Sequence, residues 1–263
     1  MASESWLEQF FPYLAQHLEE TRDHVVSEWS LMDNPNIVLC IATGYLIFCK
    51  YIGPFLMKNR RPYSLKNTIL VYNAIQILAC IYFSYTIVNE GLYVLTTLNC
   101  DPEKFYHPRI PEVIYQLMFL KMLELIETVF FILRKKQSQV TGLHLYHHST
   151  TFLFCWLALK YRGGLGMSTF ALLNCLVHIL MYTYYTIAAL GSPEVQRAIQ
   201  GFKRYITIIQ MIQFTIVLIL IARYVLSGCV KGGILALLFF PNVIIVFYMF
   251  YDFYNSTYNK KNK

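Results

Sequence analysis

The stretch Leu143-His144-Leu145-Tyr146-His147-His148 places three of the protein's seven histidines within five residues, at the start of an apolar run. On an α-helix these histidines lie at about 0°, 300° and 40°, which is one narrow face. Imidazole titrates near neutral pH, so three on one face can form a metal-ligand set, a proton relay or a nucleophile with supporting groups. The alternative is a polar cluster at a membrane entry that only contacts lipid headgroups. The sequence on either side distinguishes between these interpretations.

The surrounding sequence is that of an integral membrane protein. Of its 263 residues, 56% are hydrophobic and 14% are charged, and the mean hydropathy is +0.43, whereas soluble domains carry about 25% charged residues. Seven apolar runs are long enough to span a bilayer, at residues 37–56, 67–88, 113–133, 142–160, 165–190, 205–226 and 233–254. We therefore predict an all-α membrane fold with seven transmembrane helices over residues 37–254. An N-terminal segment (1–36) precedes this domain, and a tail (255–263) follows it.

The charges between the runs predict the orientation of the protein in the membrane. Residues 1–36 contain seven acidic residues and one basic residue. Basic residues gather in the first, third and fifth connections and in the tail, which the positive-inside rule places in the cytosol. The fourth connection, with Lys160 and Arg162, is an exception. We expect a multi-pass protein with a lumenal N-terminus and a cytosolic C-terminus.

The tail ends in Lys260-Lys261-Asn262-Lys263. This ending resembles a dilysine retrieval signal and predicts the endoplasmic reticulum membrane as the location. The alternative is a basic tail that contacts anionic lipid.

Polar residues inside membrane helices are costly and are therefore candidate site residues. Besides the histidine stretch, three runs carry polar stripes on one helix face: Lys121, Glu124, Glu127 and Thr128; Asn174, His178, Tyr182 and Tyr185; and Thr207, Gln210 and Gln213. The alternatives are a structural ion pair for the first stripe, a core histidine in the second and hydrogen bonds between helices for the third. The rise per residue brings the four sets to similar depths in the cytosolic half. We expect one substrate tunnel that opens to the cytosol.

Basic residues surround the expected mouth of this tunnel: Arg134, Lys135, Lys136, Lys203 and Arg204. Such residues suit a phosphorylated substrate. Contact with lipid headgroups is the alternative for each of them taken singly.

Three functional classes remain open at this point. A membrane di-iron desaturase or hydroxylase uses HxxHH boxes, but its two irons need histidines from several boxes, and the membrane runs supply only those in 144–148 and His178. A seven-helix receptor or transporter agrees with the topology but does not require three histidines beside a polar shaft. The third class is an acyltransferase that acts on coenzyme A thioesters without a metal.

The four sets of polar residues resemble the motifs of the fatty acid elongases, the elongation-of-very-long-chain-fatty-acids family of 3-oxoacyl-CoA synthases. The matches are Lys121–Thr128 with KxxExxDT, His144–His148 with HxxHH, His178–Tyr185 with HxxMYxYY and Thr207–Gln213 with TxxQxxQ. Glu127 departs from the usual aspartate, and Gly142 stands where an aromatic residue is common. Gln139 is similar to the residue found in the branch that elongates long and very long chains.

The resemblance implies that an acyl-CoA and malonyl-CoA condense to a 3-oxoacyl-CoA two carbons longer, with release of carbon dioxide and coenzyme A. No cysteine or serine occupies a motif position, so a neutral imidazole is the available nucleophile. By the resemblance, His147 accepts the acyl group and His178 assists decarboxylation or the enolate. His148 lies about 100° around the helix from His147, so we expect it to orient the box or to bond to the helix of run 113–133. Glu124 or Glu127 orients an imidazole. Contacts with coenzyme A or the thioester are implied for Lys121, Arg134, Lys136, Gln139, His144, Lys203 and Thr207.

The same resemblance implies no metal, no cofactor and no nucleic acid. The expected partners are the acyl-CoA, malonyl-CoA, membrane lipid and the other enzymes of the elongation cycle: a ketoacyl reductase, a dehydratase and an enoyl reductase. The sequence leaves a homo-oligomer open. Cys100 and Cys229 fall in connections on the lumenal side, where disulfides persist. We predict that they pair, with two free thiols as the alternative.

Overall fold

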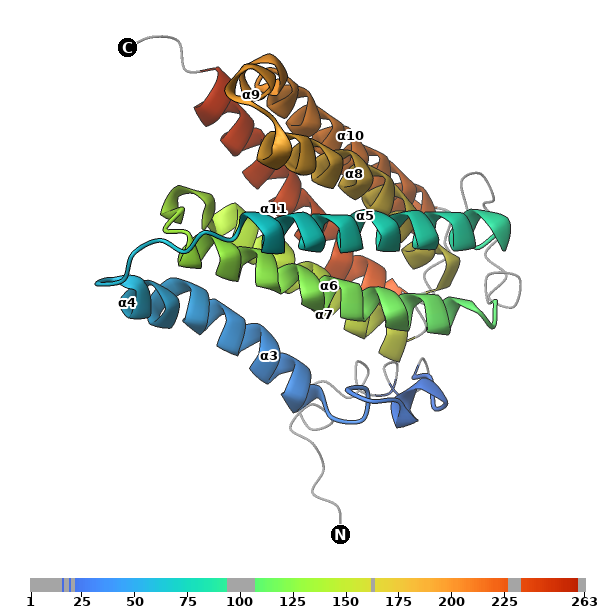
Figure 1. Cartoon of the computed structure of the whole chain (residues 1–263). Helices are drawn as coiled ribbons and strands as arrows, with labels where there is room; N and C mark the ends of the chain where they lie inside the picture. Colours follow the sequence, from blue (N-terminus) through green and yellow to red (C-terminus); the bar gives the residue numbers. More distant parts are fainter. Residues whose placement is uncertain are drawn as a thin grey trace.

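The computed structural model of the protein describes residues 16, 19, 22–93, 107–161, 164–226 and 233–259. Every regular element among these residues is helical. The long helices are α3 (Pro35–Ile47), α5 (Lys66–Asn89), α6 (Ile110–Leu133), α7 (Gly142–Lys160), α8 (Gly164–Leu190), α10 (Phe202–Leu226) and α11 (Gly233–Tyr258). The shorter elements are η1 (Val26–Glu28), η2 (Phe48–Ile52), α4 (Gly53–Met57), η3 (Gln137–Gln139) and α9 (Pro193–Ile199). Figure 1 shows their arrangement.

Each of the seven apolar runs coincides with a long helical stretch, so the all-α fold is confirmed. The first run continues from α3 through η2 into α4. Four stretches are long and apolar enough to cross a membrane: Pro35–Met57, Lys66–Asn89, Gly166–Leu190 and Phe202–Arg223. The protein is thus a helical membrane protein, whereas seven crossings and a tunnel stay predictions.

A π-helical turn, η2, interrupts the first helical stretch directly before Gly53 and Pro54. Proline has no backbone N–H and its ring crowds the preceding turn, so the wider π turn lets the helix continue through it. Gly53 then lies against α6, because a Cβ atom built there would be 3.0 Å from Cγ2 of Ile132. This close approach holds α4 on α6.

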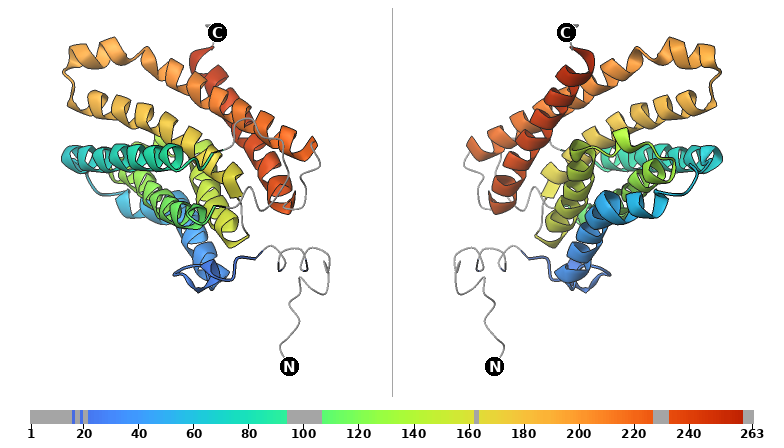
Figure 2. Two further views of the ribbon diagram at one scale, coloured as in Figure 1. Left: turned by 90° about the vertical axis from the view of Figure 1, so that its right-hand side faces the viewer. Right: turned by 90° about the vertical axis from the view of Figure 1, so that its left-hand side faces the viewer.

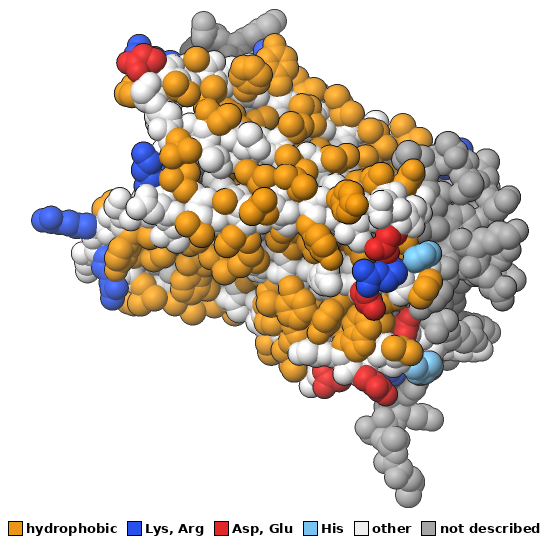
Figure 3. Space-filling view, turned by 45° about the vertical axis from the view of Figure 1, so that its right-hand side comes forward, with side chains coloured by type: hydrophobic (Ala, Val, Ile, Leu, Met, Phe, Trp, Pro, Cys, Tyr) orange, Lys and Arg blue, Asp and Glu red, His pale blue; other side chains and the backbone are white. Residues whose placement is uncertain are grey.

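Six helices form a ring. Neighbouring pairs around it are α5 with α6, α6 with α7, α7 with α11, α11 with α10, α10 with α8, and α8 with α5. Helix α3 packs outside the ring, against α7. In Figure 2, α10 and α11 cross at an angle, so the start of α10 and the end of α11 lie apart. On the face shown in Figure 3, hydrophobic side chains cover most of the helical surface, as expected of a surface that faces lipid.

The N-terminal segment packs against one end of α7. Val26 and Met32 are fully buried there. The Nζ atom of Lys160 donates to the Met32 carbonyl at 2.8 Å, and Nε1 of Trp156 donates to the Leu31 carbonyl at 2.9 Å. Lys160 is the buried last residue of α7, so its assignment to a connection was wrong. Lys160, one of the two charges that broke the positive-inside pattern, is therefore an internal group that binds the N-terminal segment.

Several predictions fall outside the described residues. These concern Cys100, Cys229, Arg162, Lys260, Lys261 and Lys263. The disulfide and the retrieval signal therefore stay predictions.

Candidate active site

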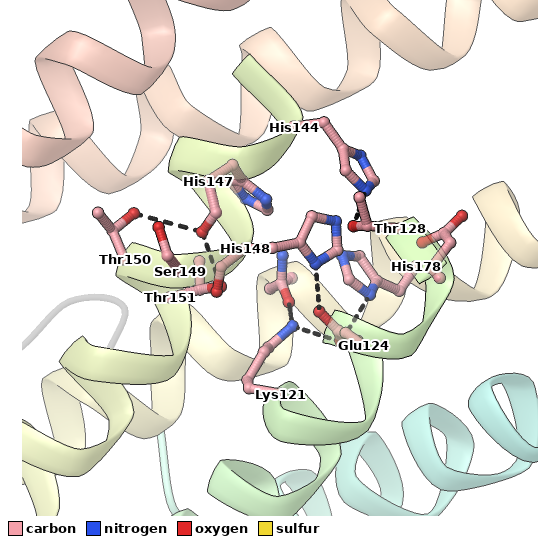
Figure 4. A network of polar contacts seen from close by, with 12 residues as sticks. Lys121, Glu124, Thr128, His144, His147, His148, Ser149, Thr150, Thr151 and His178 are labelled. Carbon is pink, nitrogen blue, oxygen red and sulfur yellow. Dashed lines mark hydrogen bonds and ion pairs between the residues drawn. The ribbon is translucent and has the colours of Figure 1, made fainter. Parts of the chain in front are cut away.

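Glu124 of α6 is the centre of a buried polar cluster, which we call the Glu124 cluster: Lys121, Glu124, His148 and His178. The Glu124 side chain is fully enclosed. Its Oε1 accepts a hydrogen bond from Nζ of Lys121 at 2.7 Å and lies 3.3 Å from Nδ1 of His178. Its Oε2 lies 3.8 Å from Nδ1 of His148. Figure 4 shows these three side chains converging on the carboxylate from α6, α7 and α8.

Lys121 has a second partner on a different helix. Its Nζ donates to Oδ1 of Asn174 on α8 at 2.6 Å. A lysine carried into an apolar bundle needs such partners, because an uncompensated buried charge is strongly destabilising. The polar stripes of the third and fifth runs thus meet, as the sequence predicted.

Thr141 caps the start of α7, the helix that carries the three histidines. The Thr141 side chain accepts from the backbone N–H of His144 at 3.2 Å, as an N-cap does. His144 therefore lies in the first turn, where its Nε2 is 2.9 Å from Oγ1 of Thr128. Thr128 in turn is 2.7 Å from the hydroxyl of Tyr45 on α3. A chain of hydrogen bonds thereby joins α7, α6 and α3.

His147 faces a different part of the bundle from the other histidines. Its ring centroid lies 6.1 Å from that of Phe214 on α10 and 6.1 Å from that of Phe250 on α11. The ring of His148 is 5.4 Å away. Within the described part of the chain, no hydrogen bond to the His147 ring is present. In Figure 4 this ring stands to the side of the Glu124 cluster. Within the described residues, His147 thus has an imidazole without a hydrogen bond, and it lies between the Glu124 cluster and aromatic side chains.

Glu127 is also buried and has its own surroundings. Its Oε2 accepts from the hydroxyl of Tyr182 at 3.4 Å. One ligand atom each of Glu127, His144 and His148 lies within 4.8 Å of the others, so these three residues could hold a metal ion. Among the described residues this is one mononuclear ligand set, whereas a di-iron centre needs ligands for two ions.

The basic connection between α6 and α7 is shaped by the end of α6. Lys135 has a φ of +54°, and the N–H groups of Lys135 and Lys136 bond back to the carbonyls of Ile132 and Phe131 at 2.9 and 2.8 Å. This is a Schellman motif with lysine at the position that usually holds glycine. The reversal leaves the Lys136 side chain exposed, in the connection that leads through η3 to the helix that carries the histidines.

The remaining predicted contacts with coenzyme A lie near the same end of the bundle. Arg134 is half-buried, Gln139 and Lys203 are exposed, and Thr207 is buried with its hydroxyl bonded to the Lys203 carbonyl at 3.2 Å. Within the described residues, none of these four side chains hydrogen bonds to the Glu124 cluster. The prediction that they bind coenzyme A is therefore untested.

The stripe on the sixth run meets α8 beside the histidines. Nε2 of Gln210 approaches the sulfur of Met181 at 3.8 Å, and Gln213 is buried. The fourth stripe thus reaches the neighbourhood of the cluster but does not bond to it among the described residues.

Three residues near the cluster were missed in the sequence. Tyr45 supports Thr128, the Tyr72 hydroxyl lies 3.4 Å from that of Tyr182, and Gln76 is fully buried one turn away on α5. Tyr72 and Gln76 are four residues apart in an apolar run, and this spacing was the signal available for them.

The comparisons with a family pattern and with individual proteins point to the same family. The sequence pattern of the ELO: GNS1/SUR4 family matches residues 30–263. A very long chain fatty acid elongase of Aedes aegypti is 31% identical over 255 residues, which cover 95% of this chain and 71% of the relative. Very long chain fatty acid elongase 1 of Mus musculus is 34% identical over 254 residues, which cover 94% and 90%. Very long chain fatty acid elongase 7 of Rattus norvegicus is 36% identical over 206 residues, which cover 76% and 72%.

Proposed function

Since the chain belongs to the ELO (GNS1/SUR4) family, we propose that it is a very-long-chain 3-oxoacyl-CoA synthase, which condenses a long-chain acyl-CoA with malonyl-CoA. The relatives are fatty acid elongases and match over most of the chain. This supports an enzyme of fatty acid elongation that acts on acyl-CoA in a membrane. The condensing reaction and the residue roles below are our proposal.

One observation carries the proposal: an unengaged imidazole, His147, lies between the Glu124 cluster and the aromatic side chains Phe214 and Phe250. A condensing enzyme needs a nucleophile for the thioester, polar groups for the charges that develop, and apolar surroundings for the acyl chain. This arrangement supplies all three at one depth of the bundle.

The first half-reaction transfers the acyl group to His147. A ring nitrogen attacks the thioester carbonyl, the carbon–sulfur bond breaks, and coenzyme A leaves as a thiolate that takes up the proton lost from the imidazole. An acyl-imidazole remains on the enzyme.

In the second half-reaction, malonyl-CoA loses carbon dioxide, and the electron pair of the broken carbon–carbon bond forms a thioester enolate. The enolate attacks the acyl carbon, the carbon–nitrogen bond to His147 breaks, and the imidazole takes up a proton from solvent as the 3-oxoacyl-CoA forms. In this proposal His178 stabilises the enolate oxygen. Glu124 orients His178 and Lys121, because its Oε1 lies 3.3 Å from Nδ1 of His178 and accepts from Nζ of Lys121.

Coenzyme A is held at the basic end in this proposal. Arg134, Lys136, Gln139 and Lys203 meet its phosphates, and His144 and Thr207 meet the thioester end. The reaction uses no metal or other cofactor. We place the enzyme in the endoplasmic reticulum membrane with a lumenal N-terminus and a cytosolic C-terminus, beside the ketoacyl reductase, dehydratase and enoyl reductase that would process its product.

The purified full chain, incubated with acyl-CoA alone, tests the covalent step. We expect release of free coenzyme A and an acyl mass on the peptide that contains His147. His147→Ala should abolish both, and His148→Ala should slow them through lost contact with Glu124. His24→Ala, at an exposed histidine, is the matched control. Release that strictly requires malonyl-CoA, or an acyl mass on another residue, would contradict the assignment to His147.

A further inference from the structure

Helix α5 carries none of the four sets of polar residues, yet it places Gln76 inside the helix bundle. The Gln76 side chain is fully enclosed, at 0% exposure. Its amide approaches the hydroxyl of Tyr72 one turn away, but within the described residues neither Nε2 nor Oε1 makes a hydrogen bond of normal geometry. A buried amide without partners destabilises a fold, and native structures hold few such groups. Gln76 is therefore a candidate for a role in binding or catalysis.

Two contacts between α5 and α8 fix the depth of Gln76. On one side of it, the Tyr72 hydroxyl lies 3.4 Å from that of Tyr182. On the other side, the Cys80 thiol lies beside the imidazole of His178. Gln76 is midway between Tyr72 and Cys80 in the sequence, and the three side chains share one face of α5, within an arc of about 80°. Gln76 therefore lies level with the turn of α8 that runs from His178 to Tyr182.

A contact between α5 and α6 gives the same depth. The Tyr72 ring meets the Phe130 ring edge-on, with centroids 5.4 Å apart. The two helices pack together and run in opposite directions (Figure 1). Gln76 is four residues after Tyr72, so it lies level with a point four residues before Phe130. That point falls between Glu124 and Glu127, which places the Gln76 amide at the depth of the Glu124 cluster.

The second half-reaction needs hydrogen-bond donors at this depth. As malonyl-CoA loses carbon dioxide, negative charge develops on its thioester oxygen, and fixed donors aimed at such an oxygen lower the barrier. Ionised Glu124 can only accept hydrogen bonds, and Lys121 already donates to Glu124 and Asn174. The Gln76 amide offers two N–H donors from a different helix. It can thus act together with His178 on one oxygen.

We propose that Gln76 is a further catalytic residue, whose amide donates a hydrogen bond to the enolate oxygen formed from malonyl-CoA. The proposal rests on the proposed function, because the enolate arises only in the condensation. The amide stays neutral and forms no bond to carbon, so the electron and proton balance of the second half-reaction is unchanged. Since charge develops on this oxygen only as carbon dioxide leaves, acyl transfer to His147 does not depend on Gln76.

Gln76→Met tests the proposal, because methionine has a similar volume but no donor. Loss of an unpaired buried amide should leave the thermal unfolding temperature of the full chain unchanged or raised. Release of coenzyme A from acyl-CoA alone should keep its rate. The single-turnover rate of 3-oxoacyl-CoA formation at saturating malonyl-CoA should fall about 100-fold, with a similar KM for malonyl-CoA. Gln116→Met makes the same change at an exposed glutamine of α6 and should alter none of these quantities.

Three results would overturn the assignment. A lower unfolding temperature together with loss of both half-reactions would make Gln76 a structural residue. An unchanged rate of 3-oxoacyl-CoA formation would show that the amide does not act in the reaction. A raised KM for malonyl-CoA at an unchanged saturating rate would place its contact in the ground state, before the enolate forms. The proposed function fails separately, if the unmodified protein forms no 3-oxoacyl-CoA from any acyl-CoA.

Discussion

At the scale of single residues, Lys121 and Glu124 form a buried ion pair, and removing either residue would leave the charge of the other without compensation. One helical turn places the ammonium beside the carboxylate, and both are buried. Removing two ions from water costs several kcal/mol per ion, which their attraction offsets only with additional hydrogen bonds. Asn174 and the two neighbouring histidines supply further polar contacts. The cost of such a pair is reasonable where a site needs fixed charge in an apolar bundle.

Glu124→Gln should therefore reduce both stability and activity. The change leaves the buried Lys121 ammonium without its counter-charge, for which we expect a loss of about 3–5 kcal/mol of stability. Condensation should fall by at least about 100-fold, since an electrostatic contact at the reacting centre is lost. Thermal unfolding and product formation measure the two effects.

Glu112→Gln is the control, because Glu112 lies on the same helix but is exposed, and its pairing with Arg109 is worth little. Near-normal condensation by Glu124→Gln, in protein that remains folded, would show that the carboxylate is only structural.

The residues of the site were predictable to the extent that they form a pattern. The charged residues of α6 and the histidines of α7 stand out because several polar groups share one face of an apolar run. Tyr45 offers no such signal, since a single hydroxyl in an apolar helix has no periodicity, and its contact with Thr128 depends on how α3 packs on the ring. That packing is set by contacts between helices distant in sequence.

At the scale of helices and their connections, the conformation of the turn after α6 sets the position of the Lys136 side chain. The left-handed conformation of Lys135 reverses the chain, so Lys136 projects from the short connection that leads to the histidines. If this connection holds coenzyme A, Lys136→Ala should raise the apparent KM for acyl-CoA about ten-fold, as expected for loss of one charge-assisted hydrogen bond.

The value of kcat should change little, since the contact is made equally in the ground state. Lys58→Ala, an exposed lysine in another basic connection, is the control. Reduced protein abundance with an unchanged KM would support contact with lipid headgroups instead.

The end of α7 makes a further prediction. Lys160→Met should release the N-terminal segment, because the buried carbonyl of Met32 would lose its donor, at a cost of about 1–3 kcal/mol. Limited proteolysis should then cut residues 22–33 faster than in the unmodified protein. Lys66→Met, at an exposed lysine that begins α5, should not change the rate. Equal cleavage rates in all three proteins would mean that Lys160 does not hold the segment.

Helix limits show what apolar runs can and cannot predict. Helix α7 begins and ends where its apolar run does, and Thr141 caps its start. Helix α6 begins at Ile110, before the expected residue 113, since Pro111 starts helices well but does not extend an apolar run. The π turn before Pro54 was not predicted, because it depends on how the backbone accommodates a proline within a continuing helix.

At the scale of the whole molecule, the predicted disulfide would join the connection between α5 and α6 to that between α10 and α11. We expect mass spectrometry of non-reduced peptides to find Cys100 linked to Cys229, and their replacement to lower stability by about 2–4 kcal/mol. Cys40→Ala, at an exposed cysteine, should change neither result. Alkylation of both thiols without prior reduction would contradict the pairing.

The order in which the six helices of the ring are synthesised affects when the protein can become active. Lys121, Glu124, His148 and His178 all lie on helices that leave the ribosome before α10 and α11, whereas the aromatic neighbours of His147 come from those last two helices. Because chains fold from the N-terminus as they are made, the charged cluster can assemble while the side of His147 that would hold the acyl chain is still open to lipid. A nascent or C-terminally truncated chain would therefore contain its ionic machinery but no enclosed place for the acyl chain, and activity would await completion of the polypeptide.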